Sequence, residues 1–206
     1  MSLAALVLAA GRGERLRPLT DETPKPLLRV GDTTLLDAAL ARVASVVDVS
    51  PDSVTVNAHW LAEQIVTHVD GRAQVSIEQP VALGTAGAVG AIHDWLGERD
   101  LLVANGDCWW TPEPDVVGFV EDWDRDRPRL LVVDDEQRPD FGGRWRFAGV
   151  SLLPNRIAAA LPVEPSGLYE QVWRDAAVDL VPTGALFIDC GTYDDLELAR
   201  ARASAD

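Results

Sequence analysis

Short continuous runs of apolar residues alternate with longer stretches of helical periodicity along the first half of the chain. The run from Leu3 to Ala9 is typical of a strand that is buried on both faces of a parallel sheet, and a glycine-rich turn follows it. A helix is predicted from Thr33 to Val46, because apolar residues recur there at helical spacing behind Thr33, which can cap the helix. The same patterns predict strands at 53–57, 75–78 and 101–104 and helices at 60–69 and 85–95.

The second half of the chain is less regular but continues this alternation. Strands are predicted at 130–133, 147–152 and 186–189, and helices at 168–177 and 193–203. Strands that alternate with helices predict an α/β protein with a Rossmann-like, doubly wound and mostly parallel sheet. A glycine turn at 142–143 indicates an antiparallel addition, so the sheet is expected to be mixed. Because no long linker divides the sequence, residues 1–206 are expected to form a single domain.

Composition narrows the classes of partner. The 206 residues carry a formal net charge of −15, and a field of that sign disfavours binding to nucleic acid or to an anionic membrane. No apolar run approaches the roughly 18 residues that a membrane span requires, and no basic leader precedes the first apolar run. Cys108 and Cys190 match no zinc motif and cannot form a disulfide framework, which fits a reducing, cytoplasmic setting. We expect a monomer or a small homo-oligomer.

Candidate chemistry begins in the turn after the first strand. Successive backbone N–H groups around Gly11 and Gly13 can cradle phosphate oxygens, and Arg15 and Lys25 add positive charge. The turn has neither the third glycine of a dinucleotide fingerprint nor the Gly-Lys-Ser/Thr of a P-loop. Lys25 is the only lysine among the 18 Lys and Arg residues. A compact ammonium on a flexible stem differs from a planar guanidinium, so Lys25 is a candidate for a phosphate site.

Two aspartates that follow predicted strands indicate a metal site. Asp107 lies in the segment Asn105-Gly106-Asp107, and Asp189 ends the strand at 186–189. Ligands of open α/β sheets bind beyond the carboxyl ends of the strands. Mg²⁺ prefers oxygen ligands and is commonly held by one or two carboxylates together with substrate phosphates. Each aspartate taken alone also suits an ordinary cap or turn, but the pair predicts a magnesium site.

The loop after the strand at 75–78 offers a place for a nucleobase. Gln79 carries both a hydrogen-bond donor and an acceptor, which suits the edge of a base. Gly84 allows the backbone to approach a planar ring closely. Taken alone, the segment is a surface turn that leads into a helix.

Together these segments resemble the nucleotidyltransferase family that joins nucleoside triphosphates to sugar 1-phosphates. The segment from Leu8 to Thr20, followed by Thr23-Pro24-Lys25-Pro26, is similar to the family signature almost residue for residue. The segments at 79–87, 105–107 and 189–192 follow in the family's order, so the resemblance covers nearly the whole chain. Segments 57–61, 105–109 and 147–151 are similar to N-acetylmuramate 1-phosphate uridylyltransferases, and mannose 1-phosphate guanylyltransferases share much of the pattern.

The resemblance implies a GT-A-like fold without a C-terminal left-handed β-helix domain. It implies Mg²⁺-dependent transfer of a nucleotide from a nucleoside triphosphate to a sugar 1-phosphate, with release of pyrophosphate. Arg15, Lys25 and Asp107 are the catalytic residues that it implies. It assigns the base and ribose to Ala9, Gly11, Gln79 and Gly84, the triphosphate to Gly13, Arg15 and Lys25, the metal to Asp107 and Asp189, and the sugar to Asn105, Gly149 and Glu170.

One departure from the family leaves the acceptor open. The thymidylyltransferase branch carries a second lysine at the sugar phosphate, and this chain has none. Arg138, Arg144 or Arg146 is expected to replace it, unless the metal alone orients the sugar phosphate.

The expected substrates are UTP and N-acetylmuramate 1-phosphate, which would place the protein in cell-wall recycling. The alternatives are GTP with mannose or heptose 1-phosphate, and cytidylyl transfer to a phosphorylated alcohol, for which Trp109 and Trp110 could supply an aromatic cage. A catalytically silent nucleotide sensor is the alternative of a different class, and the presence of Lys25 with both aspartates favours the enzyme. Cys108 and Cys190 are interpreted as small buried residues, with a thiol switch as the less favoured reading.

Overall fold

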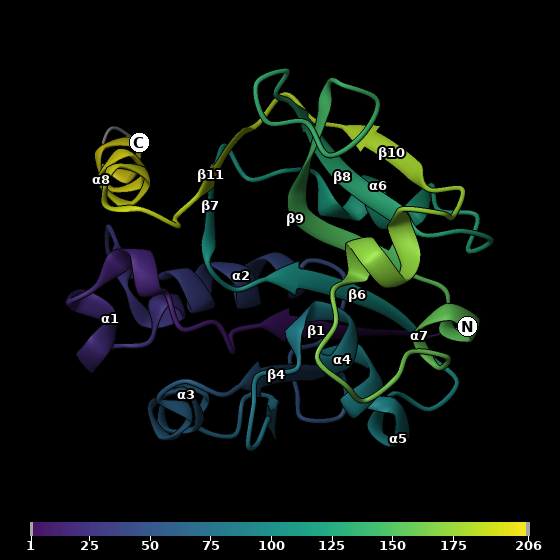
Figure 1. Ribbon diagram of the computed structural model, residues 1–206, viewed down its shortest axis with the longest axis horizontal. Helices are drawn as coiled ribbons and strands as arrows, with labels where there is room; N and C mark the ends of the chain where they lie inside the picture. Colours follow the sequence, from purple (N-terminus) through teal and green to yellow (C-terminus); the bar gives the residue numbers. More distant parts are fainter. Residues whose placement is uncertain (1, 205–206) are drawn as a thin grey trace.

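The computed structural model describes residues 2–204, and a seven-stranded central sheet with helices on both faces forms its middle (Figure 1). In spatial order the strands are β10 (Asp179–Pro182), β8 (Arg129–Asp134), β9 (Trp145–Leu153), β6 (Asp100–Asn105), β1 (Leu3–Leu8), β4 (Val54–Ala58) and β5 (Gln74–Ile77). β1 is parallel to β4 and β6, whereas β9 is antiparallel to β6 and β8. The predicted mixed, mostly parallel α/β fold is confirmed.

The side chains of β1 alternate between two hydrophobic cores. Ala5 and Val7 face one core, while Ala4 and Leu6 face the other, and all four side chains are fully buried. Because successive side chains of a strand point to opposite faces, a strand that is covered on both faces needs the continuous apolar run seen in the sequence.

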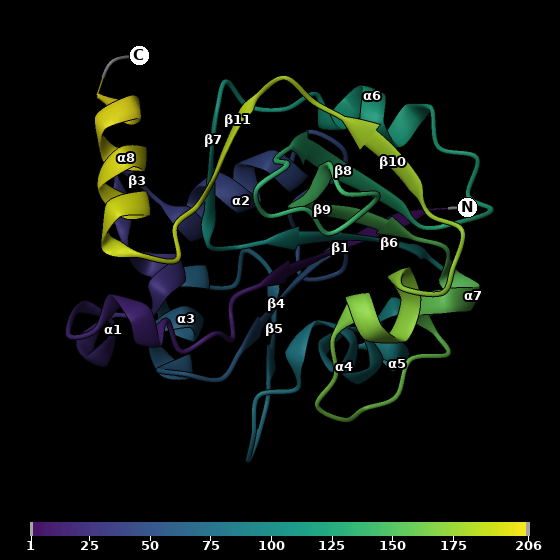
Figure 2. The ribbon, with the colours of Figure 1, turned by 45° about the horizontal axis from the view of Figure 1, so that its top comes forward.

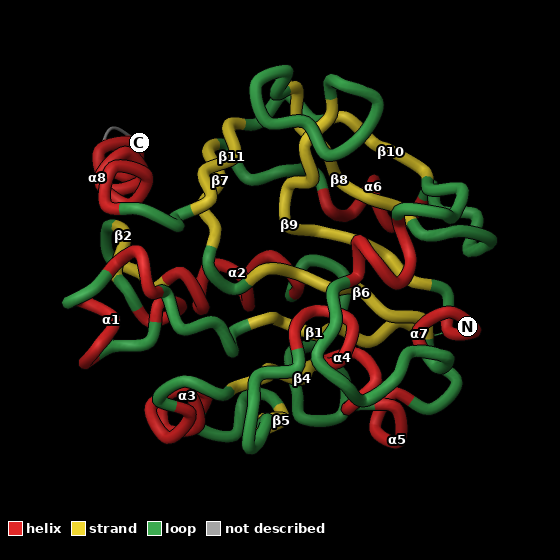
Figure 3. The backbone as a smooth tube through the Cα atoms, viewed as in Figure 1, coloured by secondary structure: helices red, strands yellow, loops and turns green. Residues whose placement is uncertain are grey.

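Helices from different parts of the chain cover the two faces of the sheet, as Figure 3 shows in red. The first core is covered by α2 (Leu35–Val43), α3 (Ala62–Val69) and α6 (Val116–Glu121). The second is covered by α4 (Gly84–Ala91), α5 (His93–Leu96), α7 (Asn155–Ala158) and the π-helical turn η3 (Tyr169–Trp173). Within the described residues, no helix combines the length and the apolar character needed to cross a membrane.

The packing of α4 depends on glycines that face the segment 161–166. A Cβ atom on Gly87 would stand 2.2 Å from the carbonyl oxygen of Glu164, and one on Gly90 would stand 2.5 Å from that of Pro162. No real side chain tolerates such distances to backbone atoms. The small residues of α4 therefore let this segment lie directly on the helix, and the peptide N–H of Ala86 donates to the carbonyl of Ser166 at 3.0 Å.

A separate two-stranded sheet stands beyond the end of β6. It pairs β7 (Cys108–Thr111) with β11 (Leu186–Asp189) in antiparallel register. The helix that follows, α8 (Tyr193–Ala203), packs beside the short strands β2 (Arg29–Val30) and β3 (Thr33–Thr34) (Figure 2). A third core between them includes Leu16, Leu35 and Leu196. This core joins α8, near the C-terminus, to the segment that follows β1.

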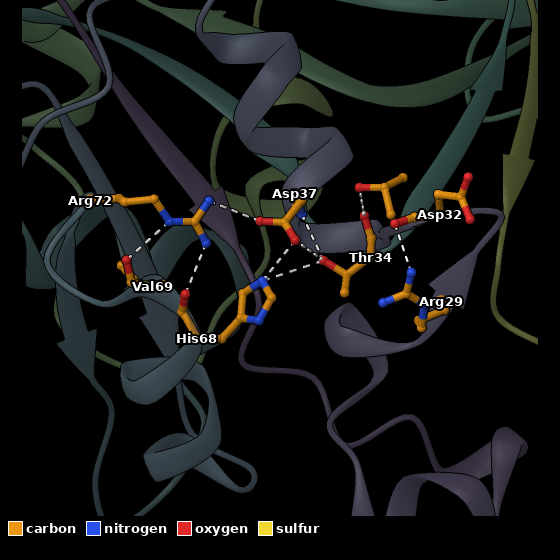
Figure 4. Close-up of polar contacts among 8 residues, drawn as sticks. Arg29, Asp32, Thr34, Asp37, His68, Val69 and Arg72 are labelled. Carbon is orange, nitrogen blue, oxygen red and sulfur yellow. Dashed lines mark hydrogen bonds and ion pairs between the residues drawn. The ribbon is translucent and has the colours of Figure 1, made fainter.

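A polar cluster ties α2 to α3 (Figure 4). The carboxylate of Asp37 accepts hydrogen bonds from Thr34 Oγ1 at 2.7 Å and Arg72 Nη1 at 3.0 Å, and it contacts His68 Nε2 at 2.9 Å. Burial alone would raise the pKa of Asp37, but these three partners hold it below its ordinary value. Thr34 also caps α2, because its hydroxyl accepts from the backbone N–H of Asp37.

Several predicted elements differ from the observed ones. The helix expected from Thr33 begins at Leu35 with Thr34 as its cap, and the helix expected at 85–95 is divided at Ile92 into α4 and α5. The helix expected at 168–177 is the short turn η3. Strands β2, β3, β7 and β10 and helices α6 and α7 were not predicted. The short helical turns before α2, also not predicted, are η1 (Glu14–Leu16), α1 (Leu19–Glu22) and η2 (Lys25–Leu27).

Candidate functional site

The single lysine of the chain lies between the two predicted metal ligands. Lys25 Nζ is 2.8 Å from Asp107 Oδ2 and 3.6 Å from Asp189 Oδ1. The lysine side chain is only 8% exposed, whereas the two aspartate side chains are 32% and 39% exposed. The ammonium group is thus buried behind two carboxylates that remain open to a ligand.

Strand pairing brings the two aspartates together. Asp107 lies in the turn that leads from β6 into β7, and Asp189 is the last residue of β11. In the antiparallel register of these strands, Asp189 lies opposite Cys108, the residue after Asp107. Gly106 permits the turn, because its N–H donates to the carbonyl of Leu8 at 2.8 Å and a Cβ atom would stand 2.7 Å from that oxygen.

The electrostatics of the cluster keep Lys25 charged. Burial of the side chain would lower the pKa of the ammonium group, but the carboxylates of Asp107 and Asp189 outweigh burial and raise it above its ordinary value. A permanent positive charge therefore stands at the point where the two carboxylates meet.

A cavity of about 230 Å³ opens beside Asp107 at the carboxyl ends of β1, β4 and β6. Besides Asp107, its lining includes three residues predicted to bind the nucleotide or the sugar, namely Gly11, Gly84 and Asn105. The rest of the lining is Leu8, Ala10, Asn57, Ala82 and Thr85. This is the position at which an open α/β sheet binds ligands.

A buried hydrogen-bond network supports the floor of this cavity, and sequence reasoning assigned it no role. Asn57 Oδ1 accepts from the N–H of Ala9 at 2.6 Å, and Asn57 Nδ2 donates to Glu78 Oε1 at 2.7 Å. Glu78 Oε2 in turn accepts from the N–H of Leu83 at 2.7 Å. Both side chains are almost fully buried. The network joins the turn after β1 to the loop before α4. Its signal in the sequence was a polar residue at the end of each of two apolar strands, namely Asn57 and Glu78.

The glycine turn is packed against Lys25. Gly13 has a left-handed backbone, and a Cβ atom there would stand 2.8 Å from Thr20 Cγ2 and 3.1 Å from Lys25 Cβ. Arg15 reaches the turn after β11, because a Cβ atom on Gly191 would stand 2.5 Å from its Nη2 atom. Two predicted phosphate-binding residues, Gly13 and Arg15, therefore lie beside the Lys25 cluster.

The remaining predicted binding residues lie at different distances from the cavity. Gly149 has φ +77°, and a Cβ atom there would contact Asn105 at 3.3 Å, so these two residues are neighbours. The N–H of Ala9 is already used by Asn57. Gln79 is exposed and does not line the cavity, although its loop does. Glu170 is exposed on η3, where its carboxylate lies 3.9 Å from Arg174.

Among the three arginines considered for the acceptor, Arg146 alone contacts the Lys25 cluster. Its Nη2 atom lies 3.3 Å from Asp189 Oδ2, on the side of that carboxylate away from Lys25. Arg144 is instead bound to Asp134.

The cysteines and tryptophans near the cluster are mainly structural. Cys108 and Cys190 are buried, and burial raises the pKa of both thiols to about 12, which leaves them protonated. Trp110 is buried with its ring centroid 4.9 Å from that of Phe187, and Trp109 packs against the third core. The two tryptophans therefore form no cage for a cationic ligand.

The donor set at the cluster fits Mg²⁺. Proteins commonly bind this ion through one or two carboxylates, and substrate phosphates supply further ligands. Asp107 and Asp189 provide two carboxylates, which already surround a cationic group. In residues 2–204 no group of three or more His, Cys, Asp and Glu side chains is arranged to hold a metal, so the cluster offers two protein ligands, Asp107 and Asp189.

The sequence is similar to those of known nucleotidyltransferases. The family model described as nucleotidyl transferase matches residues 4–142. The chain is 40% identical over 111 residues to the N-acetylmuramate alpha-1-phosphate uridylyltransferase of Neisseria meningitidis serogroup B. It is 35% identical over 139 residues to the protein of the same name from Caulobacter vibrioides. These matches cover 51% and 63% of this chain and 47% and 56% of the relatives, so the chain spans about half the length of the curated relatives it matches.

The fold is also shared with solved structures. HddC from Yersinia pseudotuberculosis, solved as a complex with GMP-PN, superposes with a TM-score of 0.76 at 19% identity. The superposition covers 98% of this chain and 99% of that one. At this identity the likeness shows the fold alone.

Proposed function

The chain belongs to the nucleotidyl transferase family, and we propose that it transfers a uridylyl group from UTP to N-acetylmuramate 1-phosphate with release of pyrophosphate. The observation that carries the proposal is Lys25 held between Asp107 and Asp189 beside a cavity at the carboxyl ends of the strands. The choice of substrates is supported by the names of the two curated relatives. A cytoplasmic reaction and a place in cell-wall recycling are parts of the same proposal.

The proposal includes Mg²⁺, which Asp107 and Asp189 would hold. When bound, the ion would neutralise charge on the phosphates of the nucleotide. Lys25 would contact the triphosphate and stabilise the negative charge that develops as pyrophosphate leaves. Arg15, on the Gly191 side of the cluster, would add a second positive charge to the same group.

The proposed reaction needs no general base from the protein. The acceptor is a phosphate monoester, whose second pKa is about 6, so its attacking oxygen is ionised at neutral pH. The residues that line the cavity include no histidine, and none is needed as a general base. The contribution of the chain is to bring two negatively charged phosphates into line and to offset their repulsion.

The cavity would receive the base and ribose. Gly11 and Gly84 line it, and the Asn57–Glu78 network would hold the two loops that carry them at a constant separation. The exposed Gln79 would reach the edge of the base from the loop before Gly84.

A substrate matrix tests the proposal. Release of pyrophosphate is measured with Mg²⁺ for UTP, GTP, CTP and dTTP, each against the 1-phosphates of N-acetylmuramate, N-acetylglucosamine, glucose and mannose. We expect strong release for UTP with N-acetylmuramate 1-phosphate. Release only with GTP and mannose 1-phosphate would move the protein to the guanylyl alternative.

The same measurement separates the remaining alternatives. Phosphocholine as an added acceptor tests cytidylyl transfer, which the packing of Trp109 and Trp110 disfavours. Binding of nucleotide without pyrophosphate release from any pair would favour a nucleotide sensor.

A further inference from the structure

The indole of Trp60 contacts the glycine turn that follows β1. Trp60 lies in the connection between β4 and α3, and its side chain is partly buried. Its Nε1 atom donates to the carbonyl oxygen of Thr20 at 2.7 Å. The guanidinium of Arg12, the residue before Gly13, lies 5.4 Å from the centroid of the Trp60 ring. One side chain therefore contacts the chain both before and after Gly13.

Thr20 carries this contact to the turn itself. Thr20 is buried, and its Oγ1 atom donates to the carbonyl oxygen of Gly13 at 2.8 Å. Its methyl group also packs on Gly13, which has a left-handed backbone and whose other close neighbour is Lys25. A continuous series of contacts thus leads from the indole of Trp60 through Thr20 to the turn beside Lys25.

The connection that carries this indole is itself fixed on both sides. On one side, His59 Nδ1 lies 2.9 Å from the carbonyl oxygen of Glu78. On the other, Leu61 has a left-handed backbone with φ +51°, which a leucine keeps only where its surroundings determine it. Gln64 Nε2 then donates to the carbonyl oxygen of Glu22 at 2.8 Å, so α3 lies beside α1 (Figure 1). The indole therefore stands on a rigid support.

The segment between Gly13 and Lys25 needs such support. Its regular elements are η1 and α1, which have three and four residues. Helical turns of this length do not keep their shape without tertiary contacts. The N–H groups of a turn bind a phosphate only while they point toward a common centre. The contacts made by Trp60 therefore bear directly on the shape of the proposed phosphate site.

We propose that Trp60 is a positioning residue for the triphosphate, because its indole keeps the Gly13 turn in the conformation that binds the phosphates. This role rests on the proposed function, in which the turn and Lys25 meet the triphosphate. Without the contacts to Thr20 and Arg12, the turn would populate other conformations. The apparent affinity for a triphosphate would then fall in proportion to the population of the binding conformation. The base and ribose would occupy the cavity, whose lining residues do not include Trp60.

Trp60→Phe removes the hydrogen bond to the turn and keeps a ring beneath Arg12. Trp95→Phe is the matched control, because Trp95 Nε1 donates to the carbonyl oxygen of Pro51 at 2.9 Å and its ring lies 4.5 Å from the Arg99 guanidinium. Trp95 lies on α5, and its hydrogen bond reaches the segment before the amino end of β4, away from the glycine turn. Dissociation constants are measured calorimetrically with Mg²⁺ for UTP, UMP and inorganic tripolyphosphate.

We expect Trp60→Phe to weaken the binding of UTP and of tripolyphosphate about 3- to 10-fold, the range for one lost hydrogen bond between neutral groups. The dissociation constant of UMP, which lacks two of the three phosphates, should change less than about twofold. Trp60→Leu, which has no ring, should lose more than Trp60→Phe, and Trp95→Phe should match the wild type. A general loss of folding would weaken all three ligands alike, and thermal unfolding midpoints show whether the variants are folded.

Hydrogen exchange measures the turn without any ligand. The N–H groups of Leu16 and Asp21 donate to carbonyl oxygens of the same segment at 2.9 Å and 3.0 Å, so their exchange reports on its opening. Peptides that span 11–22 should exchange faster in Trp60→Phe than in the wild type. The same peptides should exchange at the wild-type rate in Trp95→Phe.

These two measurements separate the role of Trp60 from the proposed function. If the wild type binds tripolyphosphate but transfers no uridylyl group, the proposed function fails. Weaker binding of tripolyphosphate with faster exchange in Trp60→Phe would still support the role of Trp60. Unchanged exchange, equal losses for UTP and UMP, or no binding of UTP and tripolyphosphate to the wild type would overturn it.

Discussion

Lys25 Nζ lies 2.8 Å from Asp107 Oδ2, although 82 positions separate the two residues in the sequence. The contact joins the turn before β7 to the helical turn η2. Asp189, near the C-terminal end of the sequence, forms a second ion pair with Lys25. The ammonium group of Lys25 is buried, and a buried charge is stable only when it is paired, here with two carboxylates from distant segments.

Lys25→Arg keeps the positive charge and changes only its shape. The lysine side chain is 8% exposed, and a wider planar guanidinium cannot take the place of an ammonium between two carboxylates. We expect kcat to fall by at least about a hundredfold, the scale of losing one preorganised electrostatic group. Steady-state kinetics of Lys25→Arg beside Arg29→Lys, an exposed control, measure this. Activity close to the wild type would show that the geometry at Lys25 is unimportant.

Asp107→Asn and Asp189→Asn each remove the carboxylate charge of one proposed metal ligand. We expect each to lower turnover by at least about a hundredfold and to raise the Mg²⁺ concentration needed for half-maximal rate. Asp94→Asn is the matched control, because that side chain is fully exposed. The reaction rate is measured as a function of Mg²⁺ concentration for each variant. An unchanged Mg²⁺ dependence in both variants would contradict the assignment of Asp107 and Asp189 as metal ligands.

Glu78→Gln tests the buried network beneath the cavity. Both carboxylate oxygens accept hydrogen bonds, so an amide would set its N–H₂ group against either Asn57 Nδ2 or the N–H of Leu83. We expect a loss of about 1–3 kcal/mol in the free energy of unfolding and a higher KM for UTP. Urea unfolding and kinetics of Glu78→Gln are compared with exposed Glu63→Gln. Wild-type stability and KM would mean that the network does not support the nucleotide site.

Gly87→Ala tests the close packing of α4. The added Cβ atom would stand 2.2 Å from the carbonyl oxygen of Glu164, so the segment 161–166 must move. Overpacking of this kind costs about 1–3 kcal/mol. Gly184→Ala is the control, since a Cβ atom there meets nothing within 4 Å. Urea unfolding should show the loss for Gly87→Ala alone, and equal stabilities would contradict the close contact.

Asp37→Asn tests the pH dependence of the cluster in Figure 4. Because its partners lower the pKa of Asp37 in the folded protein, this carboxylate contributes stability above its unfolded pKa of about 3.9. That contribution is lost as the pH falls through the lower, folded pKa. Urea unfolding should therefore show Asp37→Asn less stable than the wild type at pH 7, with the difference narrowing below about pH 4. A difference that is constant with pH would mean that the charge of Asp37 is not responsible.

Local patterns predicted much of the fold and named the three residues that the structure brings together in the Lys25 cluster. The apolar run of β1 and the bounds of β11 and α8 follow from periodicity, capping and strand length, which depend on neighbouring residues. The composition also singled out Lys25.

Features that depend on distant parts of the chain were not predicted. The pairing of β7 with β11 brings Asp189 opposite Cys108, and four residues such as Cys108-Trp109-Trp110-Thr111 carry no sign of their partner. The Asn57–Glu78 bond and the contact of Arg146 with Asp189 likewise depend on tertiary packing. The division of the helix at Ile92 was missed because the small residues of 84–91 fit a longer helix equally well.

The central claim is that the Lys25 cluster joins an acceptor phosphate to the α-phosphorus of a nucleotide. The most direct test supplies N-acetylmuramate 1-phosphate with ¹⁸O in its phosphate oxygens, together with UTP and Mg²⁺, and follows the products by mass spectrometry and ³¹P NMR. The account predicts that all of the label appears in the nucleotide sugar and that the pyrophosphate carries none. Label in the pyrophosphate, or UTP cleaved while the acceptor remains unchanged, would contradict it.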